Sequence, residues 1–163
     1  GFDEDLFLYH EDHDLSWRIR IAGWKLKVIP NAIMYHHYNF NKGVGKFYFS
    51  EKNRLYILLK NLELKTIALI SPALILVEFS QWIHAVISGW FLLKIKSYSE
   101  IVYLLPKILN KRRKLKFLRK ISDSEITRFF EGNLAVSGIK NPLLTNLLSP
   151  TLNIYWKLIR NFV

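Results

Sequence analysis

The first fourteen residues carry six carboxylates, a density of negative charge that can bind a cation or move a proton. They are Asp3, Glu4, Asp5, Glu11, Asp12 and Asp14, and no Lys or Arg precedes Arg18. Carboxylates this close together repel one another unless water, a cation or a basic partner relieves the repulsion. We therefore expect this acidic stretch, residues 3–14, to face one of these three.

The residues that follow predict the element that positions the acids. Leu15, Ile19 and Ala22 are spaced as i, i+4 and i+7, which places them on one face of a helix. Gly23 is a typical stop signal. The acids then occupy a loop and the first helical turn, where the positive end of the helix dipole favours carboxylates. An Asp at such a position is usually a helix cap, and the alternative is a general base.

The order of residues at the start of the chain is specific. It reads G-F-D-E-x-x-F-x-Y-x-E-D-x-D-L-x-W-R, followed by A-G-W and a segment that ends at Pro30. This pattern resembles the C-terminal part of inverting family 2 glycosyltransferases of the GT-A type, above all the rhamnosyltransferase-like and galactofuranosyltransferase-like members. The resemblance covers residues 1–37. It implies that Asp12 is the general base that takes the proton from an acceptor hydroxyl. It also implies an acceptor site formed by Glu11, Phe2, Asp3 and Trp17.

The resemblance also implies a cofactor and two phosphate contacts. His36 stands where the family often has a ligand for the divalent metal, Mg or Mn, that holds the nucleotide diphosphate. An inverting displacement needs one base and a cation for the departing diphosphate. A His-His pair after a strand is otherwise a polar loop. Lys42 and Arg54 are candidate phosphate-binding residues, with a solvated lysine and a structural arginine as the alternatives.

The family's nucleotide-binding half, with its Asp-x-Asp metal motif, precedes the region that resembles this chain. We therefore expect a C-terminal fragment of a longer enzyme, and we expect these 163 residues alone to transfer no sugar.

The expected fold class is an α+β fragment that is mostly α. Residues 24–29 alternate and predict a strand, and residues 32–36 predict a second one. A helix is expected from about Lys46, with Lys52, Asn53 and Lys60 pointing outward. The whole would be the C-terminal edge of a GT-A (Rossmann-like) domain followed by amphipathic and membrane-associated helices. We expect four parts. Residues 1–41 would be the C-terminal part of the catalytic domain, and residues 42–65 a connecting loop and helix. Residues 66–96 would be an apolar, membrane-associated helix, and residues 97–163 a basic, amphipathic helical tail.

The apolar part of the chain predicts contact with a membrane. Residues 66–93 contain no Lys or Arg. Ser71 and Pro72 form a helix-start signal, and a helix over 72–93 would be about 33 Å long, enough to span a bilayer. Glu78 argues against a simple span. Three interpretations stay open: a transmembrane helix, a re-entrant or in-plane membrane helix, and a buried helix of the full enzyme.

The charge distribution is uneven. Residues 1–41 carry six acids and four bases, whereas residues 42–163 carry seven acids and twenty bases. Eight bases and no acid lie in the basic segment, residues 107–120. Such a segment beside an apolar helix is typical of a juxtamembrane region on the cytoplasmic side. A solvated basic helix is the alternative, and nucleic-acid binding is disfavoured because no nucleic-acid motif accompanies the charge. The chain has no Cys, so thiolate metal sites and disulfides are excluded.

Two further helices are expected near the end of the chain. Residues 122–125 match the S-x-x-E capping box and predict a helix through about Phe130. Residues 143–163 are apolar and predict an interfacial helix.

The resulting expectation is an enzyme at the cytoplasmic face of the membrane. Its partners would be a nucleotide-sugar donor, a glycan or lipid-linked acceptor and membrane lipid, with no nucleic acid. The alternative is a non-catalytic, basic, membrane-associated interaction module.

Overall fold

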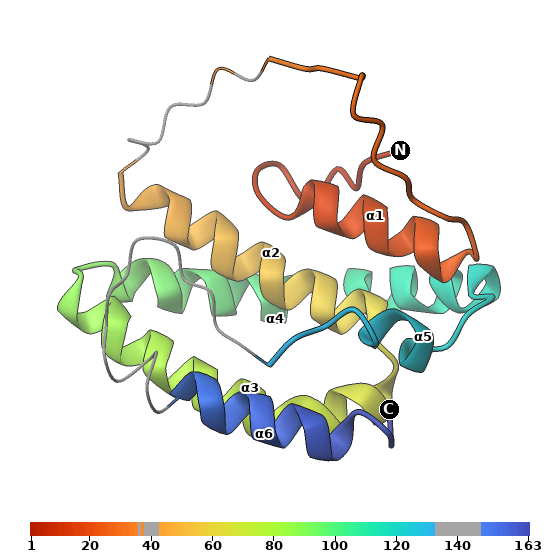
Figure 1. Cartoon of the computed structure of the whole chain (residues 1–163). Coiled ribbons are helices and arrows are strands. Elements are labelled where there is room, and N and C mark those ends of the chain that lie inside the picture. Colours follow the sequence, from red (N-terminus) through yellow and green to blue (C-terminus); the bar gives the residue numbers. More distant parts are fainter. Residues whose placement is uncertain (36, 38–42, 133–147) are drawn as a thin grey trace. The chain divides into compact units, whose positions relative to one another are not determined.

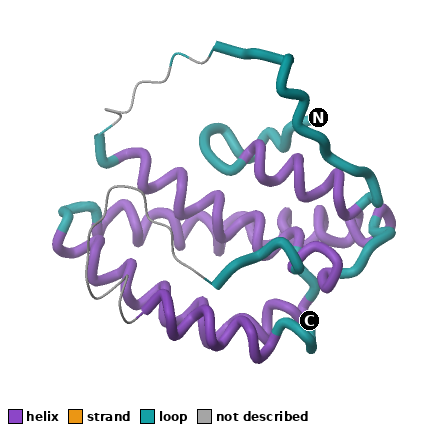
Figure 2. Tube along the Cα trace, viewed as in Figure 1, coloured by secondary structure: helices purple, strands orange, loops and turns teal. Residues whose placement is uncertain are grey.

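The computed structural model describes residues 1–35, 37, 43–132 and 148–163. All regular structure in these ranges is helical (Figure 1, Figure 2). The helices are α1 (Glu11–Ile21), α2 (Gly45–Asn61), α3 (Leu64–Ile87), α4 (Phe91–Leu118), α5 (Asp123–Thr127) and α6 (Ser149–Ile159). The expectation of a mostly α chain is confirmed.

The two predicted strands do not form in the described residues. Residues 24–29 and 32–35 have irregular backbone, and Val28 is 93% exposed. An alternating sequence becomes a strand only when a neighbouring strand completes its hydrogen bonds. No described segment supplies such a neighbour, so the β part of the expected α+β fold is wrong for this part of the chain. The GT-A edge is therefore not confirmed.

The chain forms two compact units, and each unit is built from two separate stretches of the sequence. The first unit consists of Gly1–Asn61 and Trp82–Ile121, and the second of Leu62–Gln81 and Ser122–Val163. Helix α3 contributes its first part to the second unit and its last turns to the first. The predicted parts, 1–41, 42–65, 66–96 and 97–163, stay predictions.

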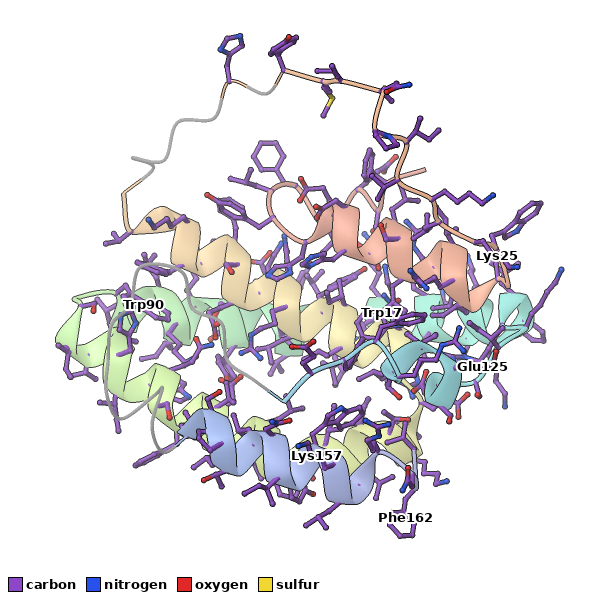
Figure 3. The ribbon with its side chains drawn as sticks, viewed as in Figure 1. Trp17, Lys25, Trp90, Glu125, Lys157 and Phe162 are labelled. Carbon is purple, nitrogen blue, oxygen red and sulfur yellow. The ribbon has the colours of Figure 1, made fainter. Side chains whose placement is uncertain are left out.

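The core of the first unit lies where α2 packs along α4, with α1 beside α2 (Figure 1). Its centre is formed by Leu6, Tyr56, Ile57, Ile101 and Ile108. Ile101 and Ile108 are seven residues apart, so they fall on one face of α4. Trp17 of α1 packs against this cluster (Figure 3). The loop before α1 thus reaches the core through a single apolar side chain, Leu6.

The first predicted helix is confirmed. Helix α1 ends at Ile21, and Gly23 has φ 81°, a left-handed conformation that glycine adopts without a steric penalty. The carbonyl of Ile21 accepts a hydrogen bond from the amide of Lys120 at 2.8 Å. The end of the basic segment is therefore fixed to the end of α1.

Helix α2 was predicted correctly, but the direction of its polar side chains was not. Lys52, Asn53 and Lys60 are buried, so the expectation that they point outward is wrong. They point inward because acidic and carbonyl groups of the first fourteen residues lie there. At the other end, Arg112 and Arg119 of the basic segment donate to the carbonyls of Leu59 and Asn61. These carbonyls belong to the last turn of α2 and have no partner within the helix.

Helix α3 differs from the prediction at both ends. It begins at Leu64 rather than at Pro72, which lies inside it. Proline has no N–H to offer the carbonyl four residues earlier, and here the hydroxyl of Ser71 donates to that carbonyl, Ala68 O, at 2.8 Å. The helix ends at Ile87 rather than at Leu93, because Gly89 has φ 72° and turns the chain into α4.

In the second unit, α6 lies beside the first part of α3 (Figure 1), and Tyr155 Oη donates to the carbonyl of Leu69 at 2.7 Å. Helix α5 ends at Thr127, short of the predicted Phe130, and Ser122 makes no side-chain cap. Instead, Asp123 accepts the amide of Glu63 at 2.6 Å and caps the start of α3. Of the predicted helix over 143–163, residues 143–147 lie outside the described ranges and the rest contains α6.

Candidate functional site

The acidic stretch is neutralised by lysines from two helices of the first unit. The carboxylate of Asp3 pairs with Lys60 of α2 at 2.6 Å and with Lys111 of α4. Asp5 pairs with Lys107 at 2.5 Å and with Lys111 at 2.7 Å. The basic segment therefore supplies counter-ions to the acids, a role that the sequence analysis did not assign to it.

A second set of contacts surrounds Asp14 in the first turns of α1. Its side chain is fully buried and accepts Arg18 Nε at 2.7 Å, Lys60 Nζ at 2.6 Å and Asn61 Nδ2 at 3.0 Å. A buried carboxylate is stable only with such partners. Asp14 is therefore a structural residue that joins α1 to the end of α2.

These contacts shift the pKa values of the paired groups. Burial opposes ionisation of Asp5, but hydrogen bonds from Lys107, Lys111 and Tyr56 outweigh it and hold the pKa well below its ordinary value. The pKa of Asp3 is lowered in the same way, against burial, by Lys111 and Lys60. For Lys111, burial favours the neutral form, but hydrogen bonds to Asp3 and Asp5 raise the pKa above its ordinary value. Asp3, Asp5 and Lys111 are therefore charged near neutral pH.

The spacing in α2 explains how one helix contacts so much of the acidic stretch. Asn53, Tyr56 and Lys60 are separated by three and four residues, so they share one face. Tyr56 Oη donates to Asp5 Oδ2 at 2.8 Å. Asn53 Nδ2 donates to the carbonyls of Leu8 and Tyr9, each at 2.8 Å. This face of α2 thus fixes the loop that leads into α1.

The loop that Asn53 holds contains two residues in a left-handed conformation. Tyr9 has φ 67° and His10 has φ 62°, although neither is glycine. Each such residue costs on the order of 1–2 kcal/mol, and this kind of strain is concentrated at functional sites. The two residues come directly before Glu11 and Asp12, so the strained turn sets the position of the first turn of α1.

His10 is part of a small polar cluster beside this turn. Its Nδ1 lies 3.3 Å from His13 Nδ1, and its Nε2 lies 3.4 Å from Ser50 Oγ of α2. Burial, followed by the nearby His13 and Arg54, lowers the pKa of His10 below its ordinary value of 6.5. The imidazole is therefore neutral at pH 7.

Asp12 differs from the paired acids. Its side chain is exposed in the first turn of α1, and one carboxylate oxygen accepts the amide of His13 at 2.8 Å. No Lys or Arg in the described ranges forms an ion pair with it. Beside it, Glu11 has one carboxylate oxygen that is buried and has no hydrogen-bond partner among the described residues. The exposed carboxylate of Asp12 in the first turn of α1 is thus available for a ligand, and Glu11 beside it keeps one buried oxygen without a partner among the described residues.

The other predicted acceptor residues lie apart from Asp12. Phe2 and Asp3 line an open pocket of about 440 Å³, together with lysines of α2 and α4. Neither Glu11, Asp12 nor Trp17 lines this pocket, and Trp17 packs in the core. The structure therefore brings Glu11 and Asp12 together but does not join them to Phe2, Asp3 and Trp17 in one cavity.

The predicted metal and phosphate ligands are placed only in part. His36 and Lys42 lie outside the described residues. Arg54 donates from Nη2 to Glu51 Oε2 at 3.2 Å and from Nε to Oε1 at 3.4 Å, so it is paired within α2. In the described ranges no group of three or more His, Asp or Glu is placed to hold a metal ion.

Sequence reasoning missed the residues that hold the acidic stretch: Asn53, Tyr56, Lys60, Lys107 and Lys111. Two signals were present. The acidic start and the basic remainder of the chain have opposite net charge, and Lys107 and Lys111 are spaced as i and i+4 on one helix face. Together these features predict counter-ions within the chain as readily as an external anionic surface.

The chain matches no family model, no curated protein and no solved structure.

Proposed function

We propose that this chain is the acceptor-side part of an inverting glycosyltransferase in which Asp12 is the general base. The proposal rests on one observation: Asp12 is exposed at the start of α1 and no Lys or Arg among the described residues pairs with it, whereas Asp3, Asp5 and Asp14 are all neutralised by bases of the chain. Its finer fold would be the C-terminal edge of a GT-A domain, as the resemblance over residues 1–37 implies.

The chemistry asked of Asp12 is the removal of one proton. The oxygen of an acceptor hydroxyl attacks the anomeric carbon of a nucleotide sugar, a new C–O bond forms, and the bond to the nucleoside diphosphate breaks with inversion. The hydroxyl proton passes to the carboxylate of Asp12. The amide of His13 holds one carboxylate oxygen, which leaves the other for the hydroxyl. Glu11, beside Asp12 in the first turn of α1, would bind another hydroxyl of the acceptor.

The charge balance around α1 supports this role. A base among six unpaired carboxylates would repel an approaching diphosphate, and the lysines of α2 and α4 neutralise three of the six, Asp3, Asp5 and Asp14. A divalent metal, Mg or Mn, would neutralise the departing diphosphate; His36 stays the proposed ligand of the metal, and Lys42 stays a proposed contact of the diphosphate.

Membrane attachment at the cytoplasmic face is part of the proposal, since glycan and lipid-linked acceptors are made there. In the described ranges α3 alone is long and apolar enough to cross a bilayer. Arg113, Lys114, Lys116 and Lys120 of the basic segment are exposed and available to anionic lipid.

The test is carried out in the protein that contains this chain together with a nucleotide-binding region. Asp12→Asn should lower sugar transfer by at least about 100-fold, the smaller end of the range for general-base catalysis, with nucleotide binding retained. Glu4→Gln is the matched control, because Glu4 is also an exposed acid but lies outside α1. Full activity of Asp12→Asn would remove Asp12 as the base. Sugar transfer by residues 1–163 alone would contradict the proposal that a separate region binds the nucleotide sugar.

A second candidate is a non-catalytic, basic, membrane-associated module. It is favoured by the exposed apolar side chains of α3 and α4. A parent protein that binds lipid vesicles but turns over no nucleotide sugar would support this candidate against the first.

A further inference from the structure

The turn between α3 and α4 carries exposed apolar side chains on both of its flanks. They are Ile83, Val86 and Ile87 at the end of α3, and Phe91, Leu92 and Ile95 at the start of α4. Val102 and Leu109 follow Ile95 at seven-residue intervals, so they continue the row along the same side of α4. We name these eight residues the hairpin face. All of them belong to the first unit.

The inward side of the same turn is firmly packed, which fixes the direction of the hairpin face. Ala85, Trp90 and Lys94 are buried. The ring of Trp90, at the turn (Figure 3), stacks on Phe47 of α2 at a centroid distance of 4.8 Å, and its Nε1 donates to His84 at 3.3 Å. Rotating either helix to hide the hairpin face would break these contacts.

Lys94 adds a charged anchor to this packing. Its Nζ pairs with Glu51 of α2 at 2.6 Å and lies 5.4 Å from the ring centroid of Trp82 and 5.6 Å from that of Trp90. Breaking such a buried pair is strongly unfavourable. The start of α4 and the end of α3 are therefore fixed against α2. Polar side chains of α2 in turn bind the acidic stretch.

The charge near the hairpin face is mainly positive. Residues 82–121 contain ten Lys and Arg and a single acid, Glu100. Lys96 near the turn and Arg113, Lys114 and Lys116 further along α4 are exposed. An apolar row flanked by exposed bases is the pattern of a helix that lies in the plane of an anionic membrane.

We propose that the α3–α4 hairpin lies in the interface of an anionic lipid membrane, with the hairpin face in the boundary between headgroups and acyl chains, and that it does not cross the bilayer. A spanning α3 would carry Glu78 into the hydrocarbon, and its last turns would have to leave Phe47, Trp90 and Lys94. The in-plane arrangement keeps every one of these contacts. This inference concerns the membrane partner alone and does not depend on sugar transfer.

The first experiment measures binding of residues 1–163 to vesicles of phosphatidylcholine with and without phosphatidylglycerol. Ile87→Asp/Leu92→Asp replaces two side chains that are 79% and 76% exposed, so folding should be retained. Val28→Asp/Met34→Asp is the control, with the same charge change at positions that are 93% and 82% exposed. We expect at least a tenfold loss of affinity for the hairpin variant and a much smaller loss for the control. Equal losses, or no binding by the unaltered chain, would overturn the proposal.

The second experiment separates an in-plane from a spanning arrangement. Because the chain has no Cys, Leu92→Cys and Val28→Cys each provide a single labelling site. An environment-sensitive fluorophore should shift to the blue on anionic vesicles at position 92 and not at position 28. Alkaline carbonate should release the bound protein. A blue shift combined with resistance to carbonate would show a spanning helix and contradict the in-plane placement. Asp12→Asn should change neither the fluorescence shift nor the release by carbonate. The catalytic role of Asp12 and the membrane placement of the hairpin are therefore tested independently.

Discussion

At the scale of single residues, the side chain that most directly shapes the candidate site is Asn53. It is fully buried, and its two hydrogen bonds go to the carbonyls of Leu8 and Tyr9, beside the left-handed residues that precede Asp12. A strained turn persists only where its surroundings determine it. Asn53 is therefore a positioning residue for the start of α1.

Replacing Asn53 by Ala should destabilise the chain by about 1–3 kcal/mol, since two partly buried carbonyls lose their donor. The free energy of unfolding from urea titration measures this. Asn31→Ala, at an exposed position, is the control and should have little effect. In the proposed parent glycosyltransferase, Asn53→Ala should lower kcat more than it raises KM. A stable Asn53→Ala variant with unchanged kinetics would contradict the positioning role.

The paired acids predict how stability changes with pH. Asp3 and Asp5 have folded-state pKa values below the ordinary 3.8, so the folded state binds fewer protons than the unfolded state around that pH. Their contribution is fully present above about pH 4 and is lost as the pH falls through the folded-state values. Urea unfolding at pH 7, 5 and 3 should show the main drop below pH 5. Asp5→Asn should reduce that drop, and an unchanged drop would show that Asp5 is not responsible.

At the scale of elements, α2 is the helix that organises the first unit. One of its faces binds the acidic stretch, and another packs against α4, where Glu51 meets Lys94. Its C-terminal carbonyls accept two arginines of the basic segment. A sequence pattern reveals that α2 is a helix, but it reveals the role of each face only when the partners are known.

The Glu51–Lys94 pair allows this packing to be tested. Lys94→Met leaves Glu51 with Arg54 alone and should cost about 3–5 kcal/mol, the range for breaking a buried ion pair. Lys96→Met, at an exposed position two residues away, is the matched control. The double variant Glu51→Gln/Lys94→Met should recover part of the loss in thermal or urea unfolding. Equal stability of Lys94→Met and Lys96→Met would contradict a packing role for the pair.

The helices also show which features of the fold can be predicted from the sequence. Helices α1 and α2 were predicted because their local signals, the apolar spacing and Gly23, do not depend on distant residues. Two predictions about α3, its start and its end, were wrong although the features that decide them are local. Ser71 supplies the hydrogen bond that compensates for Pro72 inside the helix, and Gly89 turns the chain before Leu93. The strand over 24–29 was wrong because strand formation requires a partner strand.

At the scale of the whole molecule, opposite charges within one chain shape the fold. The acidic start meets bases that lie about fifty and a hundred residues later, at Lys60 and Lys111. The composition reveals the acidic stretch and the basic segment. It does not reveal that they pair with each other, because the pairing depends on how α2 and α4 pack. The sequence proposes Asp12 as the catalytic candidate, and only the geometry distinguishes it from its neutralised neighbours.

The two units should also differ in local stability. Helix α2 of the first unit has seven buried residues, whereas α6 of the second unit has one, Leu152. Amides in elements with few buried side chains open more often and exchange faster with solvent. Hydrogen exchange followed by mass spectrometry should show at least tenfold faster exchange in α6 than in α2. Tyr155→Phe, which removes the bond to the carbonyl of Leu69, should speed exchange in α6 further and leave α2 unchanged. Equal protection of α2 and α6 would mean that the chain opens as one cooperative body, and the division into two units would then describe packing without describing stability.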